Sequence, residues 1–119
     1  MNRVPPERFE ELVAEALDGL PDWVHERLDN VEVMVEDRPP PGRRNAGLLG
    51  LYEGIPLTER TSSGYFGVMP DRITLFQTNL ERISRDEGDL RRHVRHTVVH
   101  EVAHFFGISD DRLREIDRY

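Results

Sequence analysis

The segment His100-Glu101-Val102-Ala103-His104 constrains the fold of this chain most strongly. Two histidines four residues apart lie on one face of an α-helix, about one turn apart, so both imidazoles can bind one metal ion. The pattern therefore predicts a helix here, with another residue supplying a further ligand to the metal. Glu101 points slightly off the histidine face, where its carboxylate can accept a proton from a water that the metal activates.

The residues after the two histidines indicate where the third ligand lies. Gly107 falls three residues after His104 and can turn the chain back sharply, because glycine adopts positive φ. Asp110 would then reach the open side of the metal, in the long metzincin-type arrangement with aspartate in place of the third histidine. Asp111 is the second choice. Glu115 is a poor candidate, because too few residues follow His104 for a loop and a second full helix that returns to the metal.

Two other interpretations of these residues remain open. Asp110 or Ser109 could cap the short amphipathic stretch 111–116. The two motif histidines could also be polar residues on a partly exposed helix face. Because Glu101, Gly107 and Asp110 each match a separate chemical requirement of the site, the sequence favours metal binding.

Two further histidines lie earlier on the same expected helix. His96 and His100 form a competing pair with the same spacing, but Thr97 rather than a carboxylate follows His96, and no glycine turn follows at the required distance. His93 is about 10 Å from His100 along the helix axis, which is too far for both to bind one ion. We therefore expect His93 and His96 to face solvent or to form hydrogen bonds.

Length and composition restrict the remaining classes of function. A chain of 119 residues is expected to form a single domain over residues 1–119. It contains no cysteine, which excludes disulfides, thiolate zinc sites and cysteine nucleophiles. The net charge of −7 opposes nucleic-acid binding. Because no apolar N-terminal run or membrane span is evident, we expect a soluble cytoplasmic protein that does not bind membranes.

Apolar residues at spacings of three and four predict the helices of the chain. The motif helix is expected to follow a break at Glu87-Gly88, with Asp89 as its N-cap and Leu90, Val94, Val98 and Phe105 as its buried stripe. The other expected helices run from Pro5-Pro6 to near Gly19, over 22–28 with Trp23 and Leu28 inward, and over 79–84 with Leu80 and Ile83 inward.

Three segments have the composition of β-strands. Val31, Val33 and Val35 alternate with polar or less apolar residues up to Glu36-Asp37, before a proline-rich loop at 39–42. Segment 47–52 is expected to form either an edge strand to which a peptide can add or an ordinary hairpin strand. Segment 73–76 is the third expected strand, and the polar segment 58–67 between the last two is expected to be flexible.

The motif HEVAHFFGISD, together with LLGLYEGIPL, the 31–37 strand and PDRITLF, resembles the small bacterial zincin-like metallopeptidase family of the HExxHxxGxxD type. This resemblance implies an α+β domain with a minimal zincin-like fold: a small mixed β-sheet, flanking helices and a C-terminal active-site helix. It also implies one Zn²⁺ with His100, His104 and Asp110 as metal ligands and Glu101 as general base. No methionine follows the motif, so we expect no Met-turn beneath the site. For a chain of this length we expect a shallow substrate groove.

We therefore expect a zinc metallopeptidase that hydrolyses a peptide or protein substrate, with Glu101 as general base for a metal-activated water. The alternative is a metal-binding or peptide-binding zincin-like module without efficient turnover. A helix that carries the motif by accident is the third hypothesis. Candidates for stabilising the oxyanion are the tyrosines Tyr52, Tyr65 and Tyr119.

Overall fold

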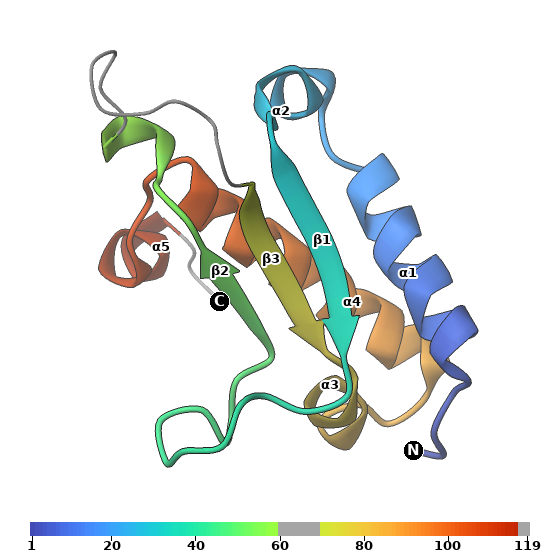
Figure 1. Ribbon diagram of the computed structural model, residues 1–119. Coiled ribbons are helices and arrows are strands. Elements are labelled where there is room, and N and C mark those ends of the chain that lie inside the picture. Colours follow the sequence, from blue (N-terminus) through green and yellow to red (C-terminus); the bar gives the residue numbers. More distant parts are fainter. Residues whose placement is uncertain (60–69, 117–119) are drawn as a thin grey trace.

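The computed structural model in Figure 1 describes residues 1–59 and 70–116. Its three-stranded sheet has the order β1-β3-β2, with β1 at Val31–Glu36, β3 at Asp71–Phe76 and β2 at Gly50–Glu53. Strand β3 is parallel to β1 and antiparallel to β2, so the sheet is mixed. The helices are α1 (Pro6–Asp18), α2 (Asp22–Arg27), η1 (Leu57–Glu59), α3 (Gln77–Arg82), α4 (Glu87–Phe105) and α5 (Asp110–Ile116). The expected α+β class, with a small mixed sheet and flanking helices, is confirmed.

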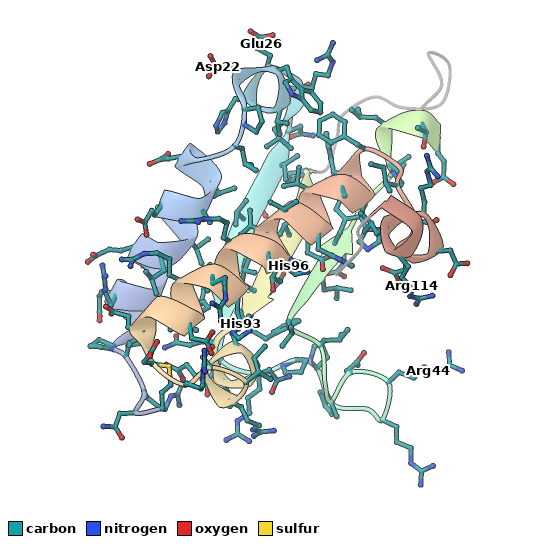
Figure 2. All side chains as sticks on the ribbon, turned by 180° about the vertical axis from the view of Figure 1, so that it is seen from behind. Asp22, Glu26, Arg44, His93, His96 and Arg114 are labelled. Atoms are coloured by element: carbon teal, nitrogen blue, oxygen red, sulfur yellow. The ribbon has the colours of Figure 1, made fainter. Side chains whose placement is uncertain are left out.

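The core lies between the sheet and two of the helices. Helix α4 crosses one face of the sheet and α1 packs beside it, as the two opposite views in Figures 1 and 2 show. The expected inward stripe of α4 is confirmed, because its four members are all fully buried. Leu90, Val94 and Val98 share a cluster with buried side chains of α1 and of the central strand β3, among them Phe9, Leu12, Ile73 and Leu75.

The beginning of α4 differs from the sequence-based expectation. The N-cap is Asp86, whose side chain accepts a hydrogen bond from the backbone N–H of Asp89 at 2.8 Å. The side chain of Asp89 in turn accepts from the backbone N–H of Arg85 at 3.0 Å. The expected break at Glu87-Gly88 and the expected cap at Asp89 were therefore wrong. Asp86 accepts from one of the free N–H groups of the first turn, Asp89 accepts from the residue before the cap, and the helix starts before the glycine.

Two expected inward side chains face solvent instead. Trp23 is 54% exposed and packs its ring against Phe106, while Val24 is the buried residue of α2. Helix α3 starts at Gln77, two residues earlier than expected, so Ile83 becomes its exposed C-cap while Leu80 is buried as predicted. Strand β2 begins three residues later than expected. Of the segment expected to be flexible, residues 60–67 lie outside the described residues.

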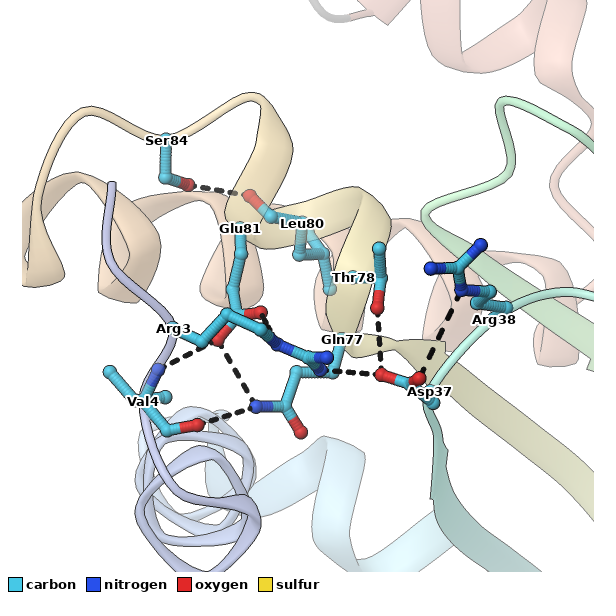
Figure 3. Close-up of polar contacts among 9 residues, drawn as sticks. All are labelled: Arg3, Val4, Asp37, Arg38, Gln77, Thr78, Leu80, Glu81 and Ser84. Atoms are coloured by element: carbon cyan, nitrogen blue, oxygen red, sulfur yellow. Dashed lines mark hydrogen bonds and ion pairs between the residues drawn. The ribbon is translucent and has the colours of Figure 1, made fainter.

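The N-terminal segment is fastened to α3 by polar contacts around one buried carboxylate (Figure 3). Glu81 accepts hydrogen bonds from the backbone N–H of Val4 and the Nε of Arg3, both at 2.9 Å, and from Gln77 at 3.1 Å. Asp37, just after β1, accepts from Thr78 at 2.7 Å and pairs with Arg3. These contacts hold α3 against the N-terminal segment and the end of β1, and α3 then leads into α4.

No helix of residues 1–59 or 70–116 combines the length and the apolar composition that crossing a membrane requires.

Candidate metal centre

The two motif histidines lie next to each other near the C-terminal end of α4. The ring centroids of His100 and His104 are 4.8 Å apart, and the ring planes are nearly perpendicular at 82°. Both side chains are partly exposed, whereas the opposite side of the helix is buried in the core. The helix therefore presents two imidazoles to the same space outside the core, as the spacing predicted.

The chain reverses direction immediately after α4 through a Schellman motif. The backbone N–H of Ile108 donates to the carbonyl of Ala103 at 3.0 Å, and that of Gly107 donates to the carbonyl of His104 at 2.9 Å. Gly107 has φ +87°, which confirms the predicted glycine turn. A Cβ at this position would also lie 2.1 Å from Oγ1 of Thr58. Both the backbone conformation and the packing of η1 against the turn therefore require glycine here.

The turn brings Asp110 back to the two imidazoles. Its Oδ1 lies 3.0 Å from Nε2 of His100 and 3.1 Å from Nε2 of His104. Ser109 caps α5 by accepting from the backbone N–H of Arg112 at 3.1 Å, which leaves the Asp110 carboxylate for the histidines. Capping of α5 by Asp110 was therefore the wrong alternative. Asp111 is 88% exposed and pairs with an arginine on α5, and the side chain of Glu115 lies outside the described part of the structure.

The donor atoms around this point fit zinc. Zinc binds histidine nitrogen and carboxylate oxygen at about 2.0–2.2 Å, so its ligand atoms in a tetrahedral site are roughly 3.3 Å apart. The distances of 3.0 and 3.1 Å from Asp110 to the histidines are close to this value. The structure brings the three predicted ligands together, although their role as ligands stays a prediction.

The hydrogen bond of His104 fixes which ring nitrogen is free. Nδ1 lies 2.8 Å from the carbonyl oxygen of Ile108, and because a carbonyl has no proton to donate, Nδ1 must donate. In the neutral ring, Nε2 then directs a lone pair toward the oxygen of Asp110. Two facing lone pairs 3.1 Å apart are stabilised by a metal cation or a proton between them. No sequence pattern pointed to Ile108, because it acts through its backbone.

Glu101 lies beside these side chains but is buried, with only 6% of the residue exposed. Its ligand atom and those of His100 and His104 all lie within 4.8 Å of one another. Burial raises the pKa of Glu101 to about 7, and the charge of Asp110 adds to this effect. His104 and a hydrogen bond from the backbone N–H of Tyr52 act in the opposite direction. Glu101 is thus a carboxyl group that can hold or release a proton near neutral pH.

A groove of about 450 Å³ runs beside the site, between strand β2 on one side and the end of α4 with the following turn on the other. Leu51, Pro56 and Ile108 contribute apolar surface to it. The hydroxyl of Tyr52, a candidate oxyanion donor, donates to Asp71 at 2.5 Å. Tyr65 and Tyr119, the other two candidates, lie outside the described residues. The groove has the dimensions of a ligand site and places backbone of β2 along one wall.

The two earlier histidines, His93 and His96, lie on α4, away from the helix α5 that carries Arg114 (Figure 2). Nδ1 of His93 is 3.0 Å from Oγ of Ser84, and His96 is exposed. The expectation that each of them faces solvent or forms hydrogen bonds is confirmed. In the described part of the chain, His100 groups as a potential metal ligand with Glu101 and His104, and His96 is not a member of this group.

Comparisons with known proteins give a family match and a similar solved structure. The family model described as zincin-like metallopeptidase matches residues 28–119, which include the whole candidate site. A solved structure of a conserved hypothetical protein from Thermus thermophilus is also similar, with 27% sequence identity and a TM-score of 0.61. This similarity covers 87% of this chain and 94% of that chain. No curated protein matches the chain.

Proposed function

The chain belongs to the zincin-like metallopeptidase family, and from that premise we propose that it is a zinc-dependent enzyme that hydrolyses peptide bonds. One Zn²⁺ would be held by His100, His104 and Asp110, with Glu101 as the general base. The observation that carries the proposal is the approach of one carboxylate oxygen to both imidazoles, at 3.0 and 3.1 Å, beside a buried glutamate. Asp110 is preferred to Glu101 as third ligand, because a single oxygen of Asp110 lies within 3.1 Å of both Nε2 atoms.

When bound, zinc supplies a Lewis acid that polarises the peptide carbonyl and makes a water molecule easier to deprotonate. The protein's own groups supply the remaining steps. The carboxylate of Glu101 accepts the proton of the attacking water and passes it to the leaving amine. Ile108 orients the His104 ring through its carbonyl. Asp110 contributes a negative charge that partly balances the cation.

The substrate in this proposal is an extended peptide or a segment of a protein. Strand β2 is the end strand in the order β1-β3-β2, and it forms one wall of the groove beside Glu101. An extended peptide can add to such an edge through main-chain hydrogen bonds. The groove is open to solvent, which suits a peptide that lies across the site.

Metal analysis combined with peptide-library hydrolysis tests the proposal. We expect the wild type to bind one zinc per chain and to cleave peptides. Glu101→Gln should keep the zinc and lose about 10²–10⁴-fold in rate, the usual contribution of a general base. Asp110→Ala should weaken zinc binding at least about tenfold, as the loss of a ligand requires. His96→Ala removes an exposed histidine one turn earlier on α4 and is the matched control, with zinc content and rate like those of the wild type.

Other outcomes would lead to different conclusions. Zinc binding without cleavage of any peptide would favour the alternative, a metal-binding or peptide-binding module without turnover. Failure of the wild type to bind zinc at micromolar concentration would refute both functions. Cleavage that is unchanged in Glu101→Gln would refute the role of this residue.

A further inference from the structure

Strand β2 and helix α4 approach each other unusually closely at Gly50. This residue is buried, and a Cβ built on it would lie 2.8 Å from Cγ2 of Thr97 and 3.2 Å from Cγ of Glu101. It would also lie 3.2 Å from the carbonyl oxygen of Thr74 in β3. A contact of 2.8 Å is shorter than carbon atoms tolerate, so any side chain here would force a neighbour or the strand to move.

The neighbour on α4 has little freedom to move. Thr97 is buried, and its Oγ1 donates to the carbonyl of His93 at 2.8 Å. Because the side chain is β-branched, rotating Cγ2 away from Gly50 would also rotate Oγ1 and break this hydrogen bond. A methyl group at position 50 would therefore displace β2 from α4 in preference to rotating Thr97. The absence of a side chain at Gly50 sets the separation between the strand and the helix.

Two residues further along β2, the backbone N–H of Tyr52 donates to the carboxylate of Glu101. In an antiparallel pair, alternate residues direct their N–H groups toward and away from the neighbouring strand. The backbone N–H of Phe76 in β3 donates to the carbonyl of Leu49, just before β2. The N–H of Leu51 therefore also points toward β3, and the N–H of Tyr52 points away from β3, toward Glu101 on α4. A backbone donor has no side-chain freedom with which to follow a moving partner. Its hydrogen bond to Glu101 is kept only while β2 keeps its distance from α4.

From these contacts we infer that Gly50 is a positioning residue for the reaction. By allowing β2 to lie directly against α4, it keeps the Tyr52 N–H within reach of the Glu101 carboxylate and so holds the general base in place beside the two imidazoles. This inference rests on the proposed function for its catalytic consequence. The contact itself is a property of the folded chain.

The kinetic test compares Gly50→Ala with Gly47→Ala. Gly47 lies three residues earlier, in the connection that leads into β2, and a Cβ there would meet no atom within 4 Å, which makes it the matched control. With the zinc-loaded protein and a peptide cleaved by the wild type, we expect kcat of Gly50→Ala to fall about ten- to hundredfold. We expect Gly47→Ala to keep the wild-type rate. Zinc affinity should be unchanged in both variants, because neither position contacts the proposed ligands.

A second substitution distinguishes positioning from general damage. Thr97→Ser removes the Cγ2 atom nearest to position 50 and keeps the hydroxyl that bonds to His93. Alone it should leave kcat near the wild-type value. Combined with Gly50→Ala, it should recover most of the lost rate, because the contacts that remain are 3.2 Å. A double variant as slow as Gly50→Ala alone would overturn the inference.

Amide hydrogen exchange of the metal-free protein gives a readout that needs no activity. The Tyr52 amide should be protected in the wild type and in Gly47→Ala, and it should exchange at least about tenfold faster in Gly50→Ala and in Glu101→Ala. Unchanged Tyr52 protection in Gly50→Ala would refute the inference even if the wild type is an active peptidase. Lost protection in a protein that cleaves no peptide would support the contact while refuting the proposed function.

Discussion

Replacing Glu101 by glutamine is predicted to stabilise the metal-free protein at neutral and alkaline pH. Burial raises the pKa of Glu101 from 4.5 to about 7. A carboxyl group whose pKa is higher in the folded than in the unfolded state favours folding only when it is protonated. The stability difference is therefore absent below about pH 4.5, grows as the pH rises, and is complete above about pH 7. Since one pKa unit corresponds to about 1.4 kcal/mol, the full difference is about 3 kcal/mol.

The assay is urea unfolding of chelator-treated wild type and Glu101→Gln at pH 4 and pH 8. At pH 8 the variant should have a free energy of unfolding about 3 kcal/mol above that of the wild type, and at pH 4 the two should agree. Glu59→Gln is the control, because Glu59 lines the same groove but is exposed. It should change stability by no more than about 0.5 kcal/mol at either pH. Equal stability of wild type and Glu101→Gln at pH 8 would refute the reasoning that burial penalises this charge.

Three further predictions concern the two ends of α4. Gly107→Ala should cost at least about 1–2 kcal/mol in thermal unfolding, because alanine is strained at φ +87° and its Cβ would collide with Thr58; wild-type stability would contradict this. Asp86→Ala should lower the free energy of unfolding by about 1 kcal/mol through loss of the N-cap, with an unchanged urea midpoint as the contrary result. The N–H of Arg85 lowers the pKa of Asp89, so its stabilisation should be present at neutral pH and lost as the pH falls below about 4. Acid titration of unfolding should show a smaller loss in Asp89→Asn than in the wild type.

Much of the candidate site could be predicted from the sequence because its parts lie within eleven residues. Helical spacing places His100 and His104 on one face, and a glycine turn has few geometries, so Asp110 could be expected near them before any tertiary contact was known. The choice between Ser109 and Asp110 as helix cap could not be made this way. Both residue types cap helices, and only the distances show which side chain turns toward the histidines.

The residues that support the site from β2 and η1 could not be predicted, because they act across long sequence separations. Segment 47–52 was expected to be an edge strand or a hairpin strand, yet nothing in its pattern distinguishes Gly50, which lies against α4, from Gly47, which has open space. Thr58 carries no signal of its contact with the turn after α4. Helix α2 shows a related limit, since six residues are too few for periodicity to decide between Trp23 and Val24.

The burial that destabilises ionised Glu101 and the position that makes it useful have a common structural cause. Strand β2 excludes water from this carboxylate, and the strand can do so only because Gly50 has no side chain. If Gly50→Ala moves β2 away, Glu101 should regain water. Its pKa should then fall, because burial is the largest cause of the raised pKa, whereas the Tyr52 hydrogen bond, which lowers the pKa, has the smallest effect. The variant would then lose catalytic rate and also lose part of the wild-type decline in stability between pH 4 and pH 8. A packing defect unrelated to Glu101 would lower stability equally at both pH values, so urea unfolding of metal-free Gly50→Ala at pH 4 and pH 8 decides between the two explanations.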